Sequence, residues 1–166
     1  SHQLDSLVAM QQSDKGQIIV PTGGGKTMCM IEDAKYRFNN TRKTIVVVAP
    51  RILLANQLSA DFLEHITNVN VLHVHSGETH HTSTTKPEEI KTFCIYPLHL
   101  HTIIFTTYHS LHRIQEADID VDTIYFDEAH NSVQRNFIEA VEYYSMYAKR
   151  SYFFTATPKH SRTPKK

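Results

Sequence analysis

Apolar, β-branched runs alternate with amphipathic helical stretches along this chain, and this alternation limits the fold more than any other feature. The run Ile45-Val46-Val47-Val48 is apolar on both faces of a strand, as required in a sheet covered by helices on both sides. Strands that alternate with helices are joined by right-handed crossovers and therefore lie parallel. The sequence thus predicts an α/β fold of three layers with a mostly parallel central sheet.

The expected elements follow from periodicity and from turn residues. The expected strands are Gln17–Val20, Thr44–Ala49, Val71–His75, Thr102–Thr106, Thr123–Asp127 and Ser151–Thr155. The expected helices are His2–Gln12, Lys26–Phe38, Ile52–His65, Glu88–Cys94, Ser110–Ala117 and Arg135–Ala148. The stretch Ser76–Pro87 is rich in Ser, Thr and His and is expected to form a mobile surface loop.

Length and composition exclude some classes of protein and leave others open. A chain of 166 residues that is 40% hydrophobic and 20% charged fits one globular domain. Seventeen basic residues balance seventeen acidic ones, which neither supports nor excludes a nucleic-acid partner, because a binding face needs only local charge. No apolar run approaches the roughly 20 residues of a membrane span, so no membrane partner is expected.

Cysteine and histidine content gives little sign of a metal site. The two cysteines form no CxxC pair, which favours a reduced intracellular setting, cytoplasmic or nucleoid-associated, for a protein of cellular or viral origin. His-x-His pairs occur at residues 73 and 75 and at residues 99 and 101, but no cysteine or carboxylate joins them at zinc-site spacing. Strand alternation is the better explanation of both pairs. His80-His81 is expected to be solvated.

The segment Pro21-Thr22-Gly23-Gly24-Gly25-Lys26-Thr27 follows an apolar strand and opens a helix, the context of a Walker A phosphate loop. Glycines let backbone N–H groups turn toward a phosphate, and the helix N-terminus adds partial positive charge. Lys26 is suited to reach the β- and γ-phosphates, and the Thr27 hydroxyl is suited to ligate Mg²⁺. The general pattern has glycine where Val20 stands. The alternative is a glycine-rich turn before an ordinary helix.

The second motif is acidic. Asp127-Glu128-Ala129-His130 directly follows the apolar strand Thr123-Ile124-Tyr125-Phe126. Carboxylates at the end of a parallel strand lie at the sheet edge where ligands bind. Asp127 is suited to hold Mg²⁺, and Glu128 is suited to orient and deprotonate an attacking water. Taken alone, the two acids would fit a helix start equally well, but the upstream phosphate loop favours the functional interpretation.

Together these motifs resemble motifs I and II of superfamily 2 helicases and translocases, and further matches follow in order. His2-Gln3 resembles the adenine-recognising glutamine motif, and residues 49–57 (Ala-Pro-Arg-Ile-Leu-Leu-Ala-Asn-Gln) resemble motif Ia. Residues 106–111 (Thr-Thr-Tyr-His-Ser-Leu) resemble motif Ib, and residues 155–158 (Thr-Ala-Thr-Pro) resemble motif III. The chain is therefore similar to the first RecA-like domain of this superfamily. The pattern is nearer to restriction-enzyme translocases and viral or phage-type helicases than to RNA-processing DEAH proteins.

The resemblance implies a role for each motif. Gln3 and the loop Thr22, Gly23, Gly24, Gly25, Lys26 and Thr27 would bind ATP, with Mg²⁺ held at Thr27 and Asp127. His130 would join Lys26, Asp127 and Glu128 in catalysis, bridging the γ-phosphate region and a partner domain. Pro50, Arg51, Gln57, Thr107 and Tyr108 would line a track for DNA or RNA. Thr155 and Thr157 would couple nucleotide state to that track.

ATP hydrolysis coupled to nucleic-acid translocation or unwinding is the activity that the resemblance implies. Residues 1–158 would form the ATP-binding domain, and residues 159–166 would begin a linker to a second RecA-like domain. A P-loop ATPase of another class is one alternative, but it leaves Thr-Ala-Thr-Pro unexplained. A nucleic-acid-binding relic without motor activity is another, although Lys26, Thr27, Asp127 and Glu128 are all intact. Structural alternatives also remain for the track: Arg51 as a solvated residue, and Thr107 as a helix cap.

Overall fold

The computed structural model describes residues 7–10, 12–21, 25–39, 41–95, 100–130 and 137–157. Within these ranges the strands form one sheet in the order β1-β7-β6-β2-β5-β3-β4, and neighbouring strands pair in parallel throughout it. The strands are β1 (Lys15–Pro21), β2 (Thr44–Ala49), β3 (Val69–Val74), β4 (Thr82–Ser83), β5 (His101–Thr107), β6 (Thr123–Phe126) and β7 (Arg150–Thr157). The predicted parallel sheet is confirmed.

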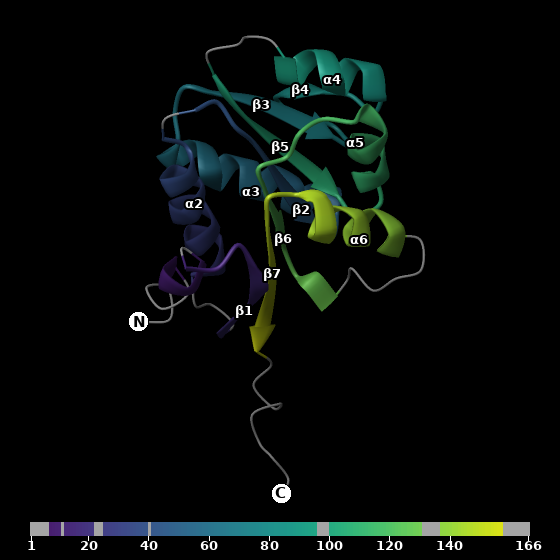
Figure 1. Ribbon diagram of the computed structural model, residues 1–166. Helices are drawn as coiled ribbons and strands as arrows, with labels where there is room; N and C mark the ends of the chain where they lie inside the picture. Colours follow the sequence, from purple (N-terminus) through teal and green to yellow (C-terminus); the bar gives the residue numbers. More distant parts are fainter. Residues whose placement is uncertain are drawn as a thin grey trace, which may run out of the picture.

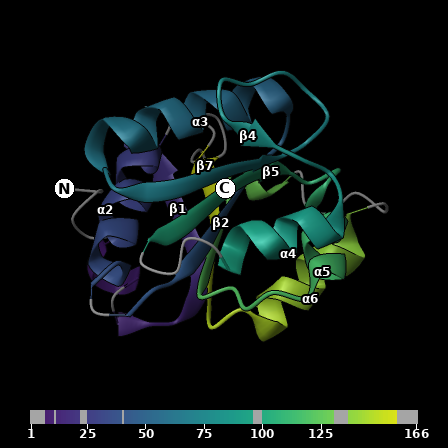
Figure 2. The same cartoon turned by 90° about the horizontal axis from the view of Figure 1, so that it is seen from above.

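Helices cover the sheet on both faces, which gives three layers (Figures 1 and 2). The helices are α2 (Lys26–Arg37), α3 (Ile52–His65), α4 (Pro87–Ile95), α5 (Leu111–Ala117) and α6 (Ile138–Tyr147). One apolar core lies between the sheet and α2 and α3, and a second lies between the sheet and α4, α5 and α6. This arrangement is the predicted RecA-like architecture.

Strand β2 lies at the centre of the sheet and shows why the sequence predicts a doubly covered sheet. All six of its residues are buried. Ile45, Val47 and Ala49 enter the core under α2 and α3, whereas Val46 and Val48 enter the opposite core. A strand with two buried faces needs apolar side chains at every position, and the β-branched run supplies them.

The structure of residues 76–87 differs in part from the surface loop that the sequence predicts. Thr82 and Ser83 form β4, whose residues pair with Leu72 and His73 of β3 at the edge of the sheet. Two polar residues carry no periodicity, so this pairing depends on the tertiary position of β3 and not on local sequence.

The predicted solvated pair His80-His81 is a second point of difference, because His81 packs against His73 of β3. His73 and His75 are both buried, with His73 Nδ1 lying 3.0 Å from His75 Nε2. His81 is half-buried and stacks on the His73 ring at a centroid distance of 5.2 Å, so of the predicted solvated pair only His80 is exposed. Burial lowers the pKa of His73 to about 3, with smaller contributions from His75 and His81, and keeps the ring neutral.

The sheet order brings the ends of three motif-bearing strands together. β7 lies between β1 and β6, so the carboxyl ends of these three strands share one edge of the sheet (Figure 1). β1 leads toward α2, β6 ends just before Asp127, and β7 carries Thr155. The fold therefore places the start of α2, the acidic motif and Thr155 side by side at this edge of the sheet.

Candidate active site

Helix α2 begins at Lys26, directly after a glycine in the left-handed conformation. Gly25 has φ 85° and ψ 30°, and its carbonyl accepts the first helical hydrogen bond, from the Cys29 N–H at 3.0 Å. A side chain is strained at such a φ, so this position requires glycine. The turn places the Lys26 side chain and the free N–H groups of the first helical turn at the same point. Thr27 is half-buried in that turn.

Asp127 and Glu128 follow β6 at the same sheet edge. The Asp127 N–H donates to the Val48 carbonyl at 2.8 Å, which continues the pairing with β2 and buries the aspartate. Glu128 then has φ 47°, in the left-handed region, where a non-glycine residue is strained. Its side chain is 36% exposed, whereas that of Asp127 is 6% exposed. The strained turn therefore leaves one carboxylate enclosed and turns the other toward solvent.

The Lys26 ammonium joins the two motifs. Lys26 Nζ lies 2.7 Å from Asp127 Oδ1 and 3.9 Å from Glu128 Oε2. Burial raises the pKa of the Asp127 carboxyl, and the Lys26 ammonium opposes that rise only in part. A cation and two carboxylates thus converge from segments separated by about one hundred residues in the sequence, as the motif analysis predicts.

Tyr108 contacts Asp127 through a buried hydrogen bond. Its side chain is 2% exposed, and its hydroxyl donates to the Asp127 carbonyl at 2.8 Å. Burial, followed by the charges of Asp127 and Glu128, raises the pKa of this hydroxyl, which therefore stays a donor. The motif analysis missed this contact, because a tyrosine within motif Ib gives no sign in sequence of which carbonyl it reaches.

The predicted track residues fall into two groups. Arg51 and Gln57 are exposed and Pro50 is half-buried, at the start and along the first turns of α3. Thr107 and Tyr108 are buried, and the Thr107 hydroxyl accepts from the Ser110 N–H at 3.3 Å. The geometry leaves Arg51 and Gln57 accessible to a ligand. Thr107 is no helix cap, because Ser110 is the N-cap residue of α5 and the Thr107 hydroxyl contacts only the N–H of Ser110 within the preceding turn.

The remaining predicted residues lie around this edge or outside the described ranges. His130 is exposed, three residues after Asp127. Phe126 pairs with Phe153, so the half-buried Thr155 lies two residues further toward the same edge. Thr157 lies in β7 with only its backbone described. Gln3, Thr22, Gly23, Gly24 and residues 158–166 lie outside the described residues.

A cavity of about 820 Å³ lies at the other edge of the sheet. Its lining includes Thr44, Asp122 and Lys149, at or beside the amino ends of β2, β6 and β7. A large cavity is often the first candidate for a ligand site. None of the residues that line this cavity belongs to a predicted motif. The side chains of Lys26, Asp127 and Glu128, in contrast, have a defined charge geometry. We therefore place the candidate site at the carboxyl edge of the sheet.

Comparison with known protein families identifies the family of this chain. Residues 2–160 match the family described as type III restriction enzyme, res subunit. The chain belongs to this family. The predicted resemblance to a superfamily 2 first RecA-like domain with restriction-enzyme character is therefore confirmed.

Individual relatives agree with membership of the res-subunit family. The ATP-dependent helicase SGS1 of Saccharomyces cerevisiae is 33% identical over 70 residues, which are 42% of this chain and 5% of SGS1. A nuclease-deletion mutant of the type ISP restriction-modification enzyme LlaGI, solved with a DNA substrate mimic, superposes with a TM-score of 0.78 at 22% identity, covering 96% of this chain and 17% of that one. The Pyrococcus furiosus Hef helicase domain gives a TM-score of 0.68 at 22% identity, covering 94% of this chain and 32% of that one. This res-subunit chain thus has a RecA-like helicase fold and spans a small part of its relatives.

No helix within the described ranges has both the length and the apolar character that a membrane span needs.

Proposed function

We propose that this chain is an ATP-binding motor domain that hydrolyses ATP to drive translocation along nucleic acid or its unwinding. The observation that carries the proposal is the convergence of the Lys26 ammonium with Asp127 and Glu128, at 2.7 and 3.9 Å, beside a helix N-terminus. A lysine ammonium, a buried carboxylate and a second, more exposed carboxylate are groups that recur in sites for phosphoryl transfer to water.

The side chains at this edge fit a magnesium–nucleotide complex. The N-terminus of α2 and Lys26 supply positive charge for the phosphates, and Asp127 together with the Thr27 hydroxyl supplies the hard oxygen donors that Mg²⁺ prefers. Bound Mg²⁺ would neutralise phosphate charge. Gln3, Thr22, Gly23, Gly24 and Gly25 complete the nucleotide site that we propose.

Glu128 is the residue that we assign to water activation. It is the more exposed of the two carboxylates and follows Asp127 directly, so it can face a water that approaches the phosphate held at Lys26. The left-handed turn at Glu128 separates its carboxylate from the enclosed one. We assign His130, Thr155 and Thr157 to contacts that transmit nucleotide state toward a second RecA-like domain.

The exposed start of α3 is the part of the nucleic-acid track that the geometry supports best. Arg51 and Gln57 are exposed donors there, suited to phosphate oxygens, and contacts of this kind read no sequence. LlaGI was solved with a DNA substrate mimic, which favours DNA as the partner of this chain. For the buried Thr107 and Tyr108 we propose support of the track and of Asp127, without direct contact to nucleic acid.

Binding of a fluorescent ATP analogue to a Lys26→Ala variant tests the nucleotide site. Lys26 is a point charge at the end of a formed helix, so its loss should abolish tight binding and leave the fold intact. Lys35→Ala is the matched control, because Lys35 lies on the same helix with 46% of its side chain exposed, and its ion pair within the described part of the chain is with Glu32. Equal binding by the parent and the Lys26→Ala variant would show that the phosphate-loop assignment is wrong.

A further inference from the structure

A pair of buried imidazoles lies at the end of β3, which β2 and β5 separate from β6 and its acidic motif. His73, in β3, is 0% exposed, and His75, just beyond the end of the strand, is 3% exposed. The ring of Phe105, which belongs to the core under α2 and α3, lies 5.4 Å from the His73 ring. The imidazoles therefore lie on the α3 face of the sheet. Together with Gly77, to which they are bonded, we call them the histidine relay.

The hydrogen bonds of the relay fix the protonation of both rings. The Gly77 N–H donates to His75 Nδ1 at 3.1 Å. A backbone N–H can only donate, so Nδ1 of His75 carries the lone pair and Nε2 carries the proton. His75 Nε2 then donates to His73 Nδ1 at 3.0 Å, which leaves the proton of His73 on its Nε2. That atom is buried without a hydrogen-bond partner among the described residues. The relay is therefore intact only when both rings are neutral.

The relay holds residues 76–81 against the start of α3. A Cβ atom on Gly77 would lie 2.5 Å from Cγ2 of Ile52, the first residue of α3, so the backbone packs directly on that side chain. One turn further along α3, Asn56 Nδ2 donates to the Glu78 carbonyl at 3.0 Å. The bond from Gly77 to His75 therefore fixes the segment at the point where it covers the first turn of α3.

Few other contacts fasten this segment. A cavity of about 770 Å³ is lined by Ser59 and Ala60 of α3 and by Thr79 and His81 of the segment, so the two are not closely packed there. The His81 ring stacks on the His73 ring, at a centroid distance of 5.2 Å and an interplanar angle of 8°. The segment is thus held at both ends by contacts that involve the relay imidazoles.

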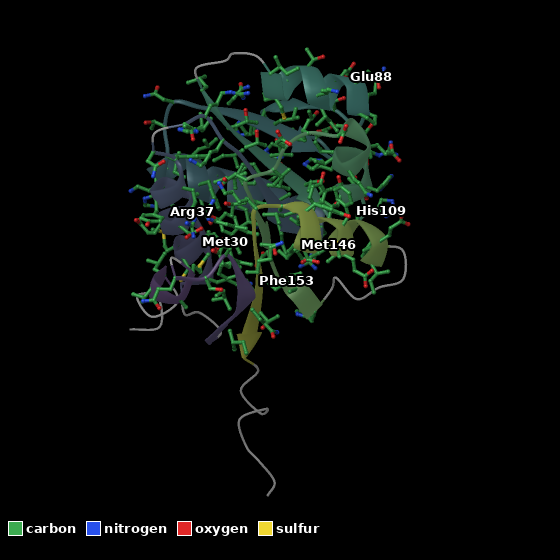
Figure 3. The ribbon with its side chains drawn as sticks, viewed as in Figure 1. Met30, Arg37, Glu88, His109, Met146 and Phe153 are labelled. Atoms are coloured by element: carbon green, nitrogen blue, oxygen red, sulfur yellow. The ribbon has the colours of Figure 1, made fainter. Side chains whose placement is uncertain are left out.

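The surroundings of the relay offer no counter-charge to a protonated ring within the described part of the chain. The neighbours of His73 on β4 and β5 are Ser83 and Phe105, and the titratable group that faces it is His81. Glu88 lies on α4, which covers the opposite face of the sheet (Figure 3). The charged or titratable side chains of the segment and of α3 with its N-cap point to solvent beside His81: Glu78, His80, Arg51, Asp61, Glu64 and His65 are exposed.

A proton added to either imidazole breaks a relay contact. On His75 it goes to Nδ1, which then faces the Gly77 N–H as a second donor. On His73 it goes to Nδ1, which then faces the Nε2–H of His75. Burial lowers the pKa of His75 below its ordinary value of 6.5 and lowers the pKa of His73 to about 3. The neutral rings therefore stabilise the closed segment fully above pH 6.5, and this contribution is lost as the pH falls below that value.

We propose that the histidine relay is an acid-sensitive latch: protonation of an imidazole frees residues 76–81 from α3 while the central sheet stays folded. Release uncovers Ile52 in the first turn of α3, because Gly77 packs on it in the closed form. The latch goes beyond the proposed function and does not depend on it, since the relay contains none of the residues assigned to the nucleotide site.

Hydrogen exchange of the Gly77 amide in the 166-residue chain follows the latch directly. Each rate is divided by that of an unstructured peptide at the same pH, and the Ile104 amide of β5 reports on the sheet. The His75→Asn variant keeps an acceptor near the position of Nδ1 but does not titrate. His80→Asn is the matched control, because it makes the same change at an exposed histidine of the same segment.

Between about pH 6.5 and about pH 5, Gly77 protection in the parent and in His80→Asn should fall about tenfold for each pH unit, because opening takes up one proton. It should stay constant in His75→Asn, and Ile104 should stay protected in all three proteins. Constant Gly77 protection in the parent, or an equal fall in His75→Asn, would show that the imidazoles are no latch. Simultaneous loss of protection at Gly77 and Ile104 would mean global unfolding and would also overturn the proposal.

The imidazole ¹⁵N shifts of the parent supply a second measurement should His75→Asn not fold. At neutral pH the relay requires an unprotonated Nδ1 and a protonated Nε2 in both His73 and His75. His75 Nδ1 should then gain its proton over the same pH range in which Gly77 loses protection. A proton on Nδ1 of either neutral ring, or a titration of His75 that leaves Gly77 protected, would contradict the latch.

Discussion

Replacing Glu128 by glycine should stabilise the domain relative to replacing it by glutamine. Glu128 has φ 47°, and the left-handed conformation costs an L-residue roughly 1–2 kcal/mol. Glycine adopts this φ freely but loses about 0.5–1 kcal/mol through the entropy of the unfolded chain. Both variants lose the 3.9 Å pair with Lys26, so that contribution cancels. The remaining difference is about 1 kcal/mol, which for a domain of this size shifts the melting temperature by about 2–4 °C.

The assay is thermal unfolding of the Glu128→Gly and Glu128→Gln variants side by side, with a control position outside the site. Asp118, at the end of α5, has φ 56° and is exposed, so Asp118→Gly compared with Asp118→Ala should show a gain of similar size. If Glu128→Gly melts at or below Glu128→Gln while the Asp118 pair behaves as expected, the turn at Glu128 is not strained. A confirmed gain would mean that the domain gives up stability to hold this carboxylate in place.

Three further outcomes follow from the same geometry. Burial raises the folded-state pKa of the Asp127 carboxyl above its ordinary value of 3.8. The carboxyl therefore stabilises the fold fully at pH values below 3.8 and loses this contribution as the pH rises through the raised pKa. The free energy of unfolding in urea, measured against pH, should show this loss in the parent and not in Asp127→Asn. In a polypeptide that joins this chain to the second RecA-like domain that we propose, Glu128→Gln should keep ATP binding and lower turnover by about 10² or more, the scale of a lost general base; unchanged turnover would move water activation to another residue. The 166-residue chain alone should bind ATP but displace no strand from a tailed duplex. The family resemblance implies that an arginine of a second RecA-like domain stabilises the charge on the γ-phosphate in the transition state, a contribution of about 10³–10⁵ in rate. Robust unwinding by the monomer would contradict this need for a second domain.

The central sheet could be predicted because its strands carry their own signal. β2 and α3 have the predicted bounds, since an unbroken β-branched run and an amphipathic helix leave little choice of boundary. β4 could not be predicted, because Thr82 and Ser83 pair only where β3 presents a free edge. The ends of β1, β3, β5 and β7 differ from prediction by one or two residues, where pairing partners and not local pattern decide the limit.

The candidate site could be predicted where motif and topology coincide. Lys26 and Asp127 meet because a phosphate loop and an acidic strand end both belong at the carboxyl edge of a parallel sheet. The contacts of Tyr108 and of the buried Arg37, which bonds to Asp33, Tyr152 and the Met10 carbonyl, could not be predicted in this way. Their hydroxyl and guanidinium groups bond to carbonyls and carboxylates that lie far away in sequence, and such contacts depend on the packed fold. The prediction of roles for Arg51 and Gln57 still awaits a binding experiment.

The rate of ATP hydrolysis tests the central claim most directly, measured with and without added nucleic acid on a polypeptide that joins this chain to the second RecA-like domain that we propose. The measurement compares no addition, duplex DNA, single-stranded DNA and RNA at fixed low salt, because phosphate contacts weaken as salt rises. The proposed motor should hydrolyse ATP slowly alone and several-fold faster with at least one of these polymers, and Lys26→Ala should abolish both rates. Hydrolysis that none of the polymers accelerates, or that survives loss of Lys26, would contradict the assignment of this domain as a nucleic-acid-dependent motor.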